Sequence, residues 1–246
     1  MIWQTAKADD IGGRDDQQDK VEIFEAPDGS QVMLVLADGM GGHAGGEIAA
    51  QAAIDVVRET WRRHLDVTIE SEGFLSAIIA DAHERINEVG EKHGLTPRST
   101  IVLLHLAGDK ALWAHVGDSR LYHFRDGVAN VRTRDHSVVQ MLVDMGKVQE
   151  DEMGDHPDQN RLTQSLGGDP EPQADFGGSD LAAGDGFVLC SDGLWENVSA
   201  DEMAQTANAG LLPQATLDLV TLATERGGKD GDNVAIAIAR IDDSEG

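Results

Sequence analysis

The stretch Leu36-Ala37-Asp38-Gly39-Met40-Gly41-Gly42-His43-Ala44-Gly45-Gly46-Glu47 decides how the chain folds, because one carboxylate joins an apolar run to a glycine-rich loop. Residues 31–37 are aliphatic and β-branched, which predicts a mostly buried strand that ends at the Asp-Gly pair. Helical spacing resumes from Glu47. Glycines lack Cβ atoms, so the loop between can approach a ligand or an ion closely. An Asp-Gly pair is also a common turn signal, so this stretch alone is compatible with a cation site or with a simple turn.

The same arrangement recurs along the chain, and this recurrence favours the cation site. Residues 111–116 precede Asp118, residues 186–190 precede Asp192, and residues 234–238 follow Asp232, and all three runs are apolar. Strand ends are rigid and can hold carboxylates in place, but clustering these groups without a cation would be costly. Oxygen ligands favour Mg²⁺ or Mn²⁺ over zinc, and Cys190 is the only cysteine of the chain.

The chain is strongly acidic, with 19 Lys and Arg against 45 Asp and Glu and a formal net charge of -26. Such a charge repels nucleic acid and anionic membrane surfaces, so neither is expected as a partner. No apolar run approaches the ~20 residues of a membrane span, and the first residues lack an apolar signal core. We therefore expect a cytoplasmic protein, and a single cysteine inside an apolar strand agrees with that compartment.

Turn signals and helix faces predict an α+β fold with antiparallel sheets, in one domain of residues 1–246. Asp-Gly or Gly-Asp pairs separate three predicted hairpins: residues 21–24 with 31–37, 100–106 with 111–116, and 121–124 with 128–131. Two amphipathic helices should each cover a sheet. Their apolar faces are Ala49, Ala53, Val56, Val57 and Trp61, then Leu75, Ile78, Ile79, Ala82, Ile86 and Val89.

The second half of the chain predicts shorter elements. Helices are expected over residues 138–145, 201–208 and 217–226, and closing strands over residues 187–190 and 234–241. Residues 146–160 are polar and weakly periodic, which indicates a mobile excursion from the domain.

A series of short motifs, in this order, resembles those of the metal-dependent serine/threonine protein phosphatases of the type 2C (PPM) family. The motifs are Arg14-Asp15-Asp16-Gln17-Gln18-Asp19, Asp38-Gly39-Met40-Gly41-Gly42-His43, Gly117-Asp118-Ser119-Arg120, Asp135-His136-Ser137, His156-Pro157, Leu162-Thr163-Gln164-Ser165-Leu166-Gly167, Ser191-Asp192-Gly193-Leu194 and Gly231-Asp232-Asn233. The resemblance covers nearly the whole chain. It implies a four-layer α-β-β-α sandwich of two antiparallel sheets flanked by helices, with a small flap segment at about residues 138–166.

The resemblance also assigns roles to residues of these motifs. Asp38 would bridge two metal ions, and Gly39 would bind one of them through its backbone carbonyl. Asp192 and Asp232 would complete the coordination of the other ion. Asp19 would bind metal or steer metal-bound water.

Asp118 matches, together with Asp192, the position that holds a third and looser ion in bacterial members of the family. The implied cofactor is therefore Mn²⁺ or Mg²⁺, with two core ions and this third one. Two divalent ions lower the pKa of a shared water, so that hydroxide can attack phosphorus without a phosphoenzyme.

Two residues that do not bind metal are further candidates for the catalytic site, beside Asp38. Arg14 matches a phosphate-binding arginine, since a planar guanidinium can bind two phosphate oxygens; the alternative is a surface ion pair with Asp15 or Asp16. His43 could contact the phosphate or transfer a proton, and the alternative is a hydrogen bond that orders the loop.

Three residues depart from the family pattern. Met40 stands where eukaryotic members carry a histidine, and a thioether cannot donate a proton to the leaving oxygen. Gln17 replaces the common asparagine near Asp19, and Arg98 occupies a packing position that is usually glycine.

Two other functions compete with phosphatase activity. The spacing Gly39-x-Gly41-x-x-Ala44 fits a dinucleotide-binding loop, but Asp38 would face the pyrophosphate and no acidic residue ends a second strand about 20 residues on. A non-enzymatic fold that binds phosphoproteins is the other alternative, and the complete aspartate set argues against it.

The resemblance therefore implies an enzyme that hydrolyses phosphoserine and phosphothreonine in proteins and reverses a bacterial serine/threonine kinase. Phosphorylated proteins are the expected partners, the cognate kinase itself among them, and the expected state is a monomer.

Overall fold

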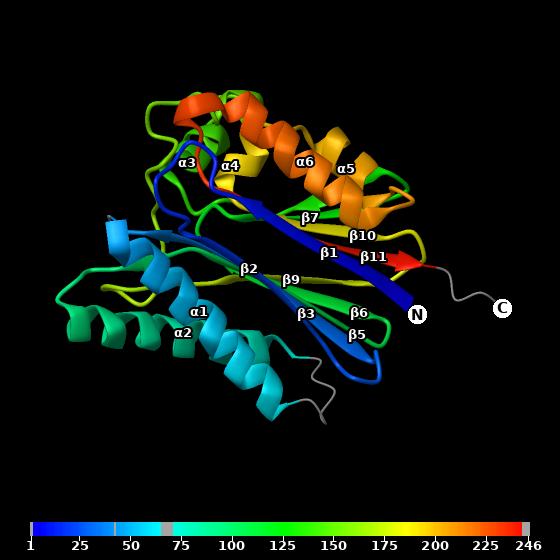
Figure 1. The fold of residues 1–246 in the computed structure, drawn as a ribbon, viewed down its shortest axis with the longest axis horizontal. Coiled ribbons are helices and arrows are strands. Elements are labelled where there is room, and N and C mark those ends of the chain that lie inside the picture. Colours follow the sequence, from blue (N-terminus) through cyan, green and yellow to red (C-terminus); the bar gives the residue numbers. More distant parts are fainter. Residues whose placement is uncertain (1, 42, 65–70, 243–246) are drawn as a thin grey trace.

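Two antiparallel sheets stack face to face at the centre of the molecule, and helices cover both outer faces (Figure 1). The computed structural model describes residues 2–41, 43–64 and 71–242, without the side chains of residues 2, 43 and 44. The first sheet has the order β1 (Ile2–Asp10), β11 (Val234–Asp242), β10 (Gly186–Cys190), β7 (Arg120–Arg125) and β8 (Val128–Arg132). The second has the order β2 (Asp19–Glu25), β3 (Gln31–Met40), β5 (Ile101–Ala107), β6 (Lys110–Val116) and β9 (Asp175–Asp180), with β4 (Arg98–Ser99) paired to β3.

The helices divide between the two outer faces. The second sheet is covered by α1 (His43–Arg63) and α2 (Glu72–His93), and the first by α4 (Asp192–Trp195), α5 (Ala200–Ala207) and α6 (Leu212–Gly227). The remaining helices are α3 (Val138–Asp144) and the 3₁₀ turns η1 (Glu150–Glu152) and η2 (Gly228–Asp230).

Three separate apolar clusters account for this layering. One lies between the sheets, with Leu34 and Phe187 among its members. The second packs α1 and α2 on one sheet, and the third packs α5 and α6 on the other. The alternating strands supply one side chain to an outer cluster and the next to the central one, as in Leu34 and Val35 of β3.

The structure confirms the four-layer architecture, the three hairpins and both long amphipathic helices. Two predicted boundaries are wrong. Strand β3 does not end at Asp38-Gly39 but runs on to Met40, because Gly39 and Met40 pair with Ser99 and Arg98 of β4. Helix α1 begins at His43, before Glu47.

Strands β1 and β9 are absent from the sequence-based prediction, and α6 begins five residues before the predicted helix. Both strands are edges of their sheets, where a continuous apolar run is not needed. In β9 the sequence Asp-Phe-Gly-Gly-Ser-Asp has low strand propensity and no residue of it is buried.

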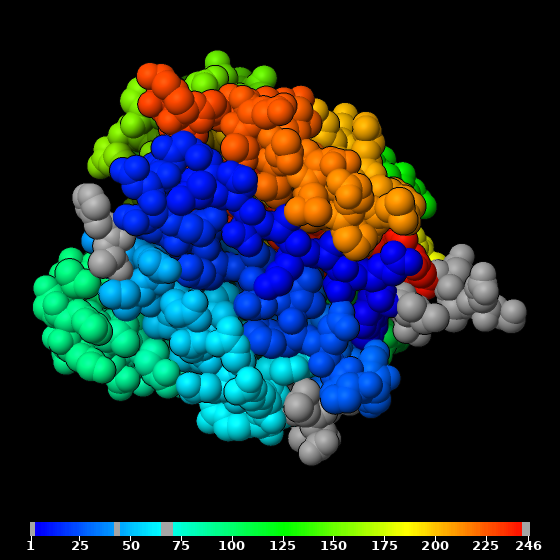
Figure 2. All heavy atoms as spheres, in the orientation of Figure 1, coloured from blue at the N-terminus to red at the C-terminus, as the bar shows by residue number. Residues whose placement is uncertain are grey.

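The first two strands lie at the surface between the helical layers in the view of Figure 2. Lys7 of β1 donates to Glu22 of β2, and Thr5 donates to Glu25, so polar contacts join the two sheets at this open edge. No helix among the described residues is long and apolar enough to cross a membrane.

Candidate metal centre

A cavity of about 440 Å³ brings together the aspartates that lie at the ends of different strands. Asp38 belongs to β3 and Asp118 follows β6, so the second sheet supplies both. Asp192 follows β10 and Asp232 precedes β11, so the first sheet supplies the other two. The site therefore lies where corresponding ends of both stacked sheets meet, and rigid strands position all four carboxylates.

Asp19 is buried and does not line the cavity. It is the first residue of β2, directly opposite Asp38 of β3 in the register. Its carboxylate accepts a hydrogen bond from the Ser191 hydroxyl (2.6 Å), and its backbone N–H donates to the side chain of Gln17 (3.0 Å). The glutamine that departs from the family pattern thus holds the backbone of Asp19.

Asp38 has a fixed backbone. Its N–H donates to the Thr100 hydroxyl (3.0 Å), and its carbonyl accepts from the Ser99 hydroxyl (2.9 Å) and the Thr100 N–H (2.8 Å). These contacts explain why the strand continues through the Asp-Gly pair, and they leave the carboxylate directed into the cavity.

The pKa values of the clustered aspartates indicate a site that favours a bound cation. Burial, followed by the charges of the other aspartates, raises the pKa of Asp19 and of Asp38 well above the ordinary value. Burial and Asp192 act in the same way on the pKa of Asp118. Burial and Asp232 raise the pKa of Asp192 to about 7. Carboxylates that disfavour their own ionised forms in this way fit a site for a divalent ion with oxygen ligands.

Gly39 lines the cavity, as expected for a residue that could offer its carbonyl to a metal. Close packing against helix α1 also requires glycine at this position. A Cβ at Gly39 would lie 1.9 Å from the carbonyl oxygen of Gly46, and a Cβ at Gly46 would lie 2.5 Å from that of Gly39. The two glycines therefore allow the first turn of α1 to lie directly against β3.

Arg14 lines the cavity and does not form the surface ion pair with Asp15 or Asp16 that was the alternative to phosphate binding. Its Nη2 donates to Asp232 (2.6 Å), and about half of its side chain stays exposed. Neither Asp15 nor Asp16 is its partner in the described structure. The side chain of His43 lies outside the described residues, so its catalytic role stays a prediction.

Sequence analysis missed Glu196, a sixth acidic group, which lies beside Asp192 and Asp232. Burial and those two charges raise its pKa to about 8. It follows Asp192 by four residues at the end of α4, and residues four apart share one face of a helix. That spacing in Asp192-Gly193-Leu194-Trp195-Glu196 was the available signal.

The other two departures from the family pattern have visible contacts. Met40 lines the cavity, while the Arg98 guanidinium donates to Ser165 Oγ (3.3 Å) and to the carbonyl of Gly167 (3.1 Å). Arg98 thus ties β4 to the end of the flap segment, which is a packing role.

A second group of potential ligands consists of His115, His136 and Asp175, none of which lines the cavity. His115 Nε2 must donate to the carbonyl of Arg134 (2.8 Å). His136 Nδ1 accepts from the Gly117 N–H (3.2 Å), so its proton resides on Nε2, which faces Asp175 (3.4 Å). With that proton in place His136 has no lone pair for a metal, and the group instead orders the loop beside Asp118.

Comparisons with known proteins agree with these features. A family model described as protein phosphatase 2C matches residues 13–212. Protein phosphatase PhpP of Streptococcus pneumoniae is 32% identical, over 96% of this chain and 97% of that protein. The solved serine/threonine phosphatase of S. agalactiae is 32% identical and superposes with a TM-score of 0.85, over 98% of this chain and 100% of that one.

A further solved structure bears on the metal. The catalytic domain of the serine/threonine protein phosphatase PstP, in complex with two manganese ions, is 29% identical, with a TM-score of 0.82 over 98% of this chain and 99% of that one.

Proposed function

The chain belongs to the protein phosphatase 2C family, and from this premise we propose that it hydrolyses phosphoserine and phosphothreonine in proteins at the aspartate cavity. The observation that carries the proposal is that four aspartates from both sheets line one cavity: Asp38, Asp118, Asp192 and Asp232. The buried Asp19 lies opposite Asp38 in the strand register.

The residues fit the divalent ions that this family implies. Asp38 would hold both core ions, together with the Gly39 carbonyl for one of them and with Asp192 and Asp232 for the other. When bound, Mn²⁺ or Mg²⁺ supplies positive charge at the phosphoryl oxygens and lowers the pKa of water. The raised pKa values of the aspartates support these assignments, since a nearby cation stabilises their ionised forms.

Asp19 and Asp118 have separate roles in this scheme. Asp19 is buried, accepts a hydrogen bond from Ser191, and would bind metal or orient metal-bound water. Asp118 lines the cavity and, with Asp192, would hold a third and looser ion.

The charge of the cavity decides which groups can receive the substrate. At roughly 5 Å and an effective dielectric near 20, one carboxylate repels one phosphate charge by about 3 kcal/mol, so the aspartates alone exclude a phosphate ester. Arg14 is the cationic side chain among the described residues that line the cavity. Its exposed guanidinium exchanges Asp232 for phosphate oxygens, which it binds in a bidentate manner.

Covalent catalysis has no support among the described residues. The Cys190 thiol is fully buried inside β10, and burial raises its pKa far above the ordinary value. Water is the proposed nucleophile, and His43 is the proposed proton-transfer group of the glycine loop.

Partners and location are also part of the proposal. Substrates are proteins phosphorylated by a cognate serine/threonine kinase, together with the kinase itself, and the enzyme acts as a cytoplasmic monomer. Helices pack on both outer sheet faces among the described residues, so no bare sheet face is available for stacking against a second chain, which supports a monomer.

The test is hydrolysis of a phosphothreonine peptide and of a small aryl phosphate, each with Mn²⁺ and with EDTA. We expect turnover of both substrates only with the metal. Activity that persists in EDTA, or that never appears with Mn²⁺ or Mg²⁺, contradicts the proposal. Asp201→Asn, on the exposed first turn of α5, is the matched control for substitutions of the cavity aspartates.

A further inference from the structure

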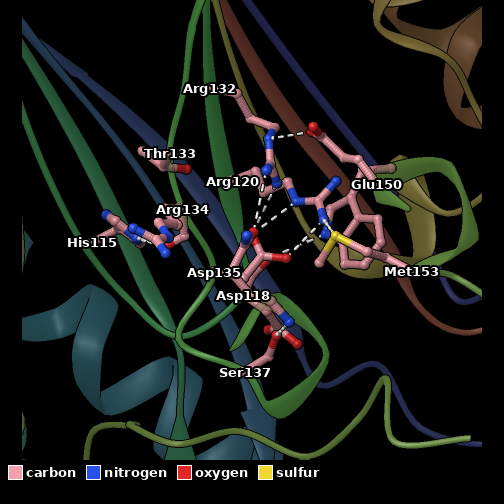
Figure 3. Close-up of polar contacts among 12 residues, drawn as sticks. His115, Asp118, Arg120, Arg132, Thr133, Arg134, Asp135, Ser137, Glu150 and Met153 are labelled. Carbon is pink, nitrogen blue, oxygen red and sulfur yellow. Dashed lines mark hydrogen bonds and ion pairs between the residues drawn. The ribbon is translucent and has the colours of Figure 1, made fainter. Parts of the chain in front are cut away.

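A buried ion pair lies beside Asp118, outside the set of proposed metal ligands (Figure 3). The Arg120 guanidinium donates to both carboxylate oxygens of Asp135, from Nε at 2.9 Å and from Nη2 at 2.7 Å. Arg120 and Asp135 are 5% and 6% exposed, so the pair is almost entirely shielded from water. A bidentate pair in such surroundings fixes the plane of the guanidinium.

Trp195 connects this pair to Asp118. The guanidinium carbon of Arg120 lies 3.5 Å from the centre of the Trp195 ring, which is a close cation–π contact. The indole N–H in turn donates to the backbone carbonyl of Asp118 (3.0 Å). The position of Arg120 therefore determines the position of the indole, and the indole holds the main chain of a proposed metal ligand.

The flap segment, residues 138–166, also contacts this pair. Met153 is 1% exposed, and its sulfur lies 3.7 Å from Nη2 of Arg120. Glu150 forms an ion pair with Arg132 (2.8 Å), and Arg132 also lies 3.6 Å from Asp135. Figure 3 shows Glu150 and Met153 approaching the two arginines from the same side.

We propose that Arg120, Asp135 and Trp195 couple docking of the flap segment to the position of Asp118, and hence to the affinity of the looser ion. Arg120 is a positioning residue, since it acts through Trp195 and does not touch the cavity. The inference rests on the proposed function only for the role of Asp118. Because coupling is reciprocal, binding of that ion stabilises the docked flap by the same factor by which docking strengthens the ion.

The first test substitutes the flap residue and leaves the core intact. Met153→Ala removes the buried contact with Arg120, and Met145→Ala is the matched control, since Met145 lies in the same segment and is 58% exposed. Hydrogen exchange of residues 146–160 is followed in EDTA and in Mn²⁺, and Mn²⁺ binding is followed by calorimetry. We expect Met153→Ala to speed hydrogen exchange in EDTA about tenfold or more and to lower the affinity of the loosest Mn²⁺ site several-fold. For Met145→Ala we expect both quantities to change by less than about twofold.

The second test acts on the core side of the contact. Arg120→Lys keeps the charge but loses the fork, and Arg62→Lys is its control, because Arg62 is an exposed arginine at the end of α1, outside the flap segment. We expect Arg120→Lys to weaken the same Mn²⁺ site several-fold, and Mn²⁺ to slow flap exchange less than in the unsubstituted protein.

Three results would overturn the coupling: unchanged flap exchange in Met153→Ala, faster exchange with unchanged Mn²⁺ affinity in both variants, or an unchanged number of bound ions in Asp118→Asn. These measurements need no turnover. If they come out as expected while the protein hydrolyses no phosphopeptide, the coupling is supported and the proposed function alone is contradicted.

Discussion

Asp38 is the residue on which the account of the site depends most, because its backbone is fixed by Ser99 and Thr100 while its carboxylate faces the cavity. We expect Asp38→Ala and Asp192→Ala to lower kcat by ~10³-fold or more, since bound metal stabilises the transition state by several kcal/mol. Asp118→Ala should lower kcat less and leave the two core ions in place. Rates measured on a phosphothreonine peptide in Mn²⁺ check this order, and ordinary rates in the first two variants would refute the bridging assignment.

Arg14 gives a prediction on substrate binding. Arg14→Lys keeps the charge but loses the bidentate geometry, so we expect kcat/KM for an aryl phosphate to fall about 10-fold, in line with ~1.5–3 kcal/mol for a charge-assisted hydrogen bond. The exposed Arg62 at the end of α1 supplies the control variant Arg62→Lys. Equal kcat/KM values in both variants would show that Arg14 does not bind the phosphate.

Individual residues show how far sequence reasoning reaches. The aspartates were predictable because each follows or precedes an apolar strand, and the structure brings Asp38, Asp118, Asp192 and Asp232 to one cavity. The contact between Arg14 and Asp232 was not predictable, since 217 residues separate the two in the chain. Glu196 was missed because α4 is only four residues long and leaves little helical periodicity to recognise.

At the scale of elements, the close approach of α1 to β3 fixes where the glycine-rich stretch lies. Gly46→Ala should destabilise the protein by about 1–3 kcal/mol, because the new Cβ would meet Gln18 at 2.3 Å and the Gly39 carbonyl at 2.5 Å. Gly45→Ala in the same turn is the control, since its Cβ meets nothing closer than 4.0 Å. Urea unfolding of both variants gives the comparison, and equal midpoints would contradict this packing.

Element boundaries were harder to predict than element types. The hairpins and long helices were found because turn signals and apolar faces are local properties of the sequence. The extension of β3 to Met40 depends on pairing with β4, about 60 residues later. The edge strands β1 and β9 carry polar or glycine-rich sequences, and their partners in the sheet, not their composition, make them strands.

For the whole molecule, the buried carboxylates predict an unusual dependence of stability on pH. The folded-state pKa of Asp192, about 7, lies above its ordinary value of 3.8, and the pKa values of Asp19, Asp38 and Asp118 are raised as well. Between the two pKa values the folded chain holds protons that the unfolded chain releases, so stability is present at low pH and is lost as the pH rises. In EDTA, Tm should therefore fall by several degrees from pH 5.5 to pH 8.

Two comparisons isolate the cluster in that experiment. Saturating Mn²⁺ should remove the decline in Tm, because the ion favours the ionised carboxylates that repel one another without it. Asp192→Asn should make the decline in EDTA shallower. A Tm that stays constant or rises between pH 5.5 and pH 8 in EDTA would contradict the raised pKa values.

The overall charge of -26 also indicates that the site needs bound cations. A protein this acidic attracts cations and repels phosphate esters unless positive charge is concentrated at the site. The four-layer fold concentrates carboxylates from both sheets at one end of the sandwich, where bound ions would reverse the local sign of the charge.

The position of bound manganese is the most direct test of the proposed two-ion site. Crystals grown with Mn²⁺ and measured at the manganese absorption edge should show at least two anomalous peaks in the cavity, two of them in contact with Asp38 and one of these also with Asp192 and Asp232. Peaks at His115, His136 and Asp175 with none at Asp38, or an empty cavity in Mn²⁺-saturated crystals, would contradict it.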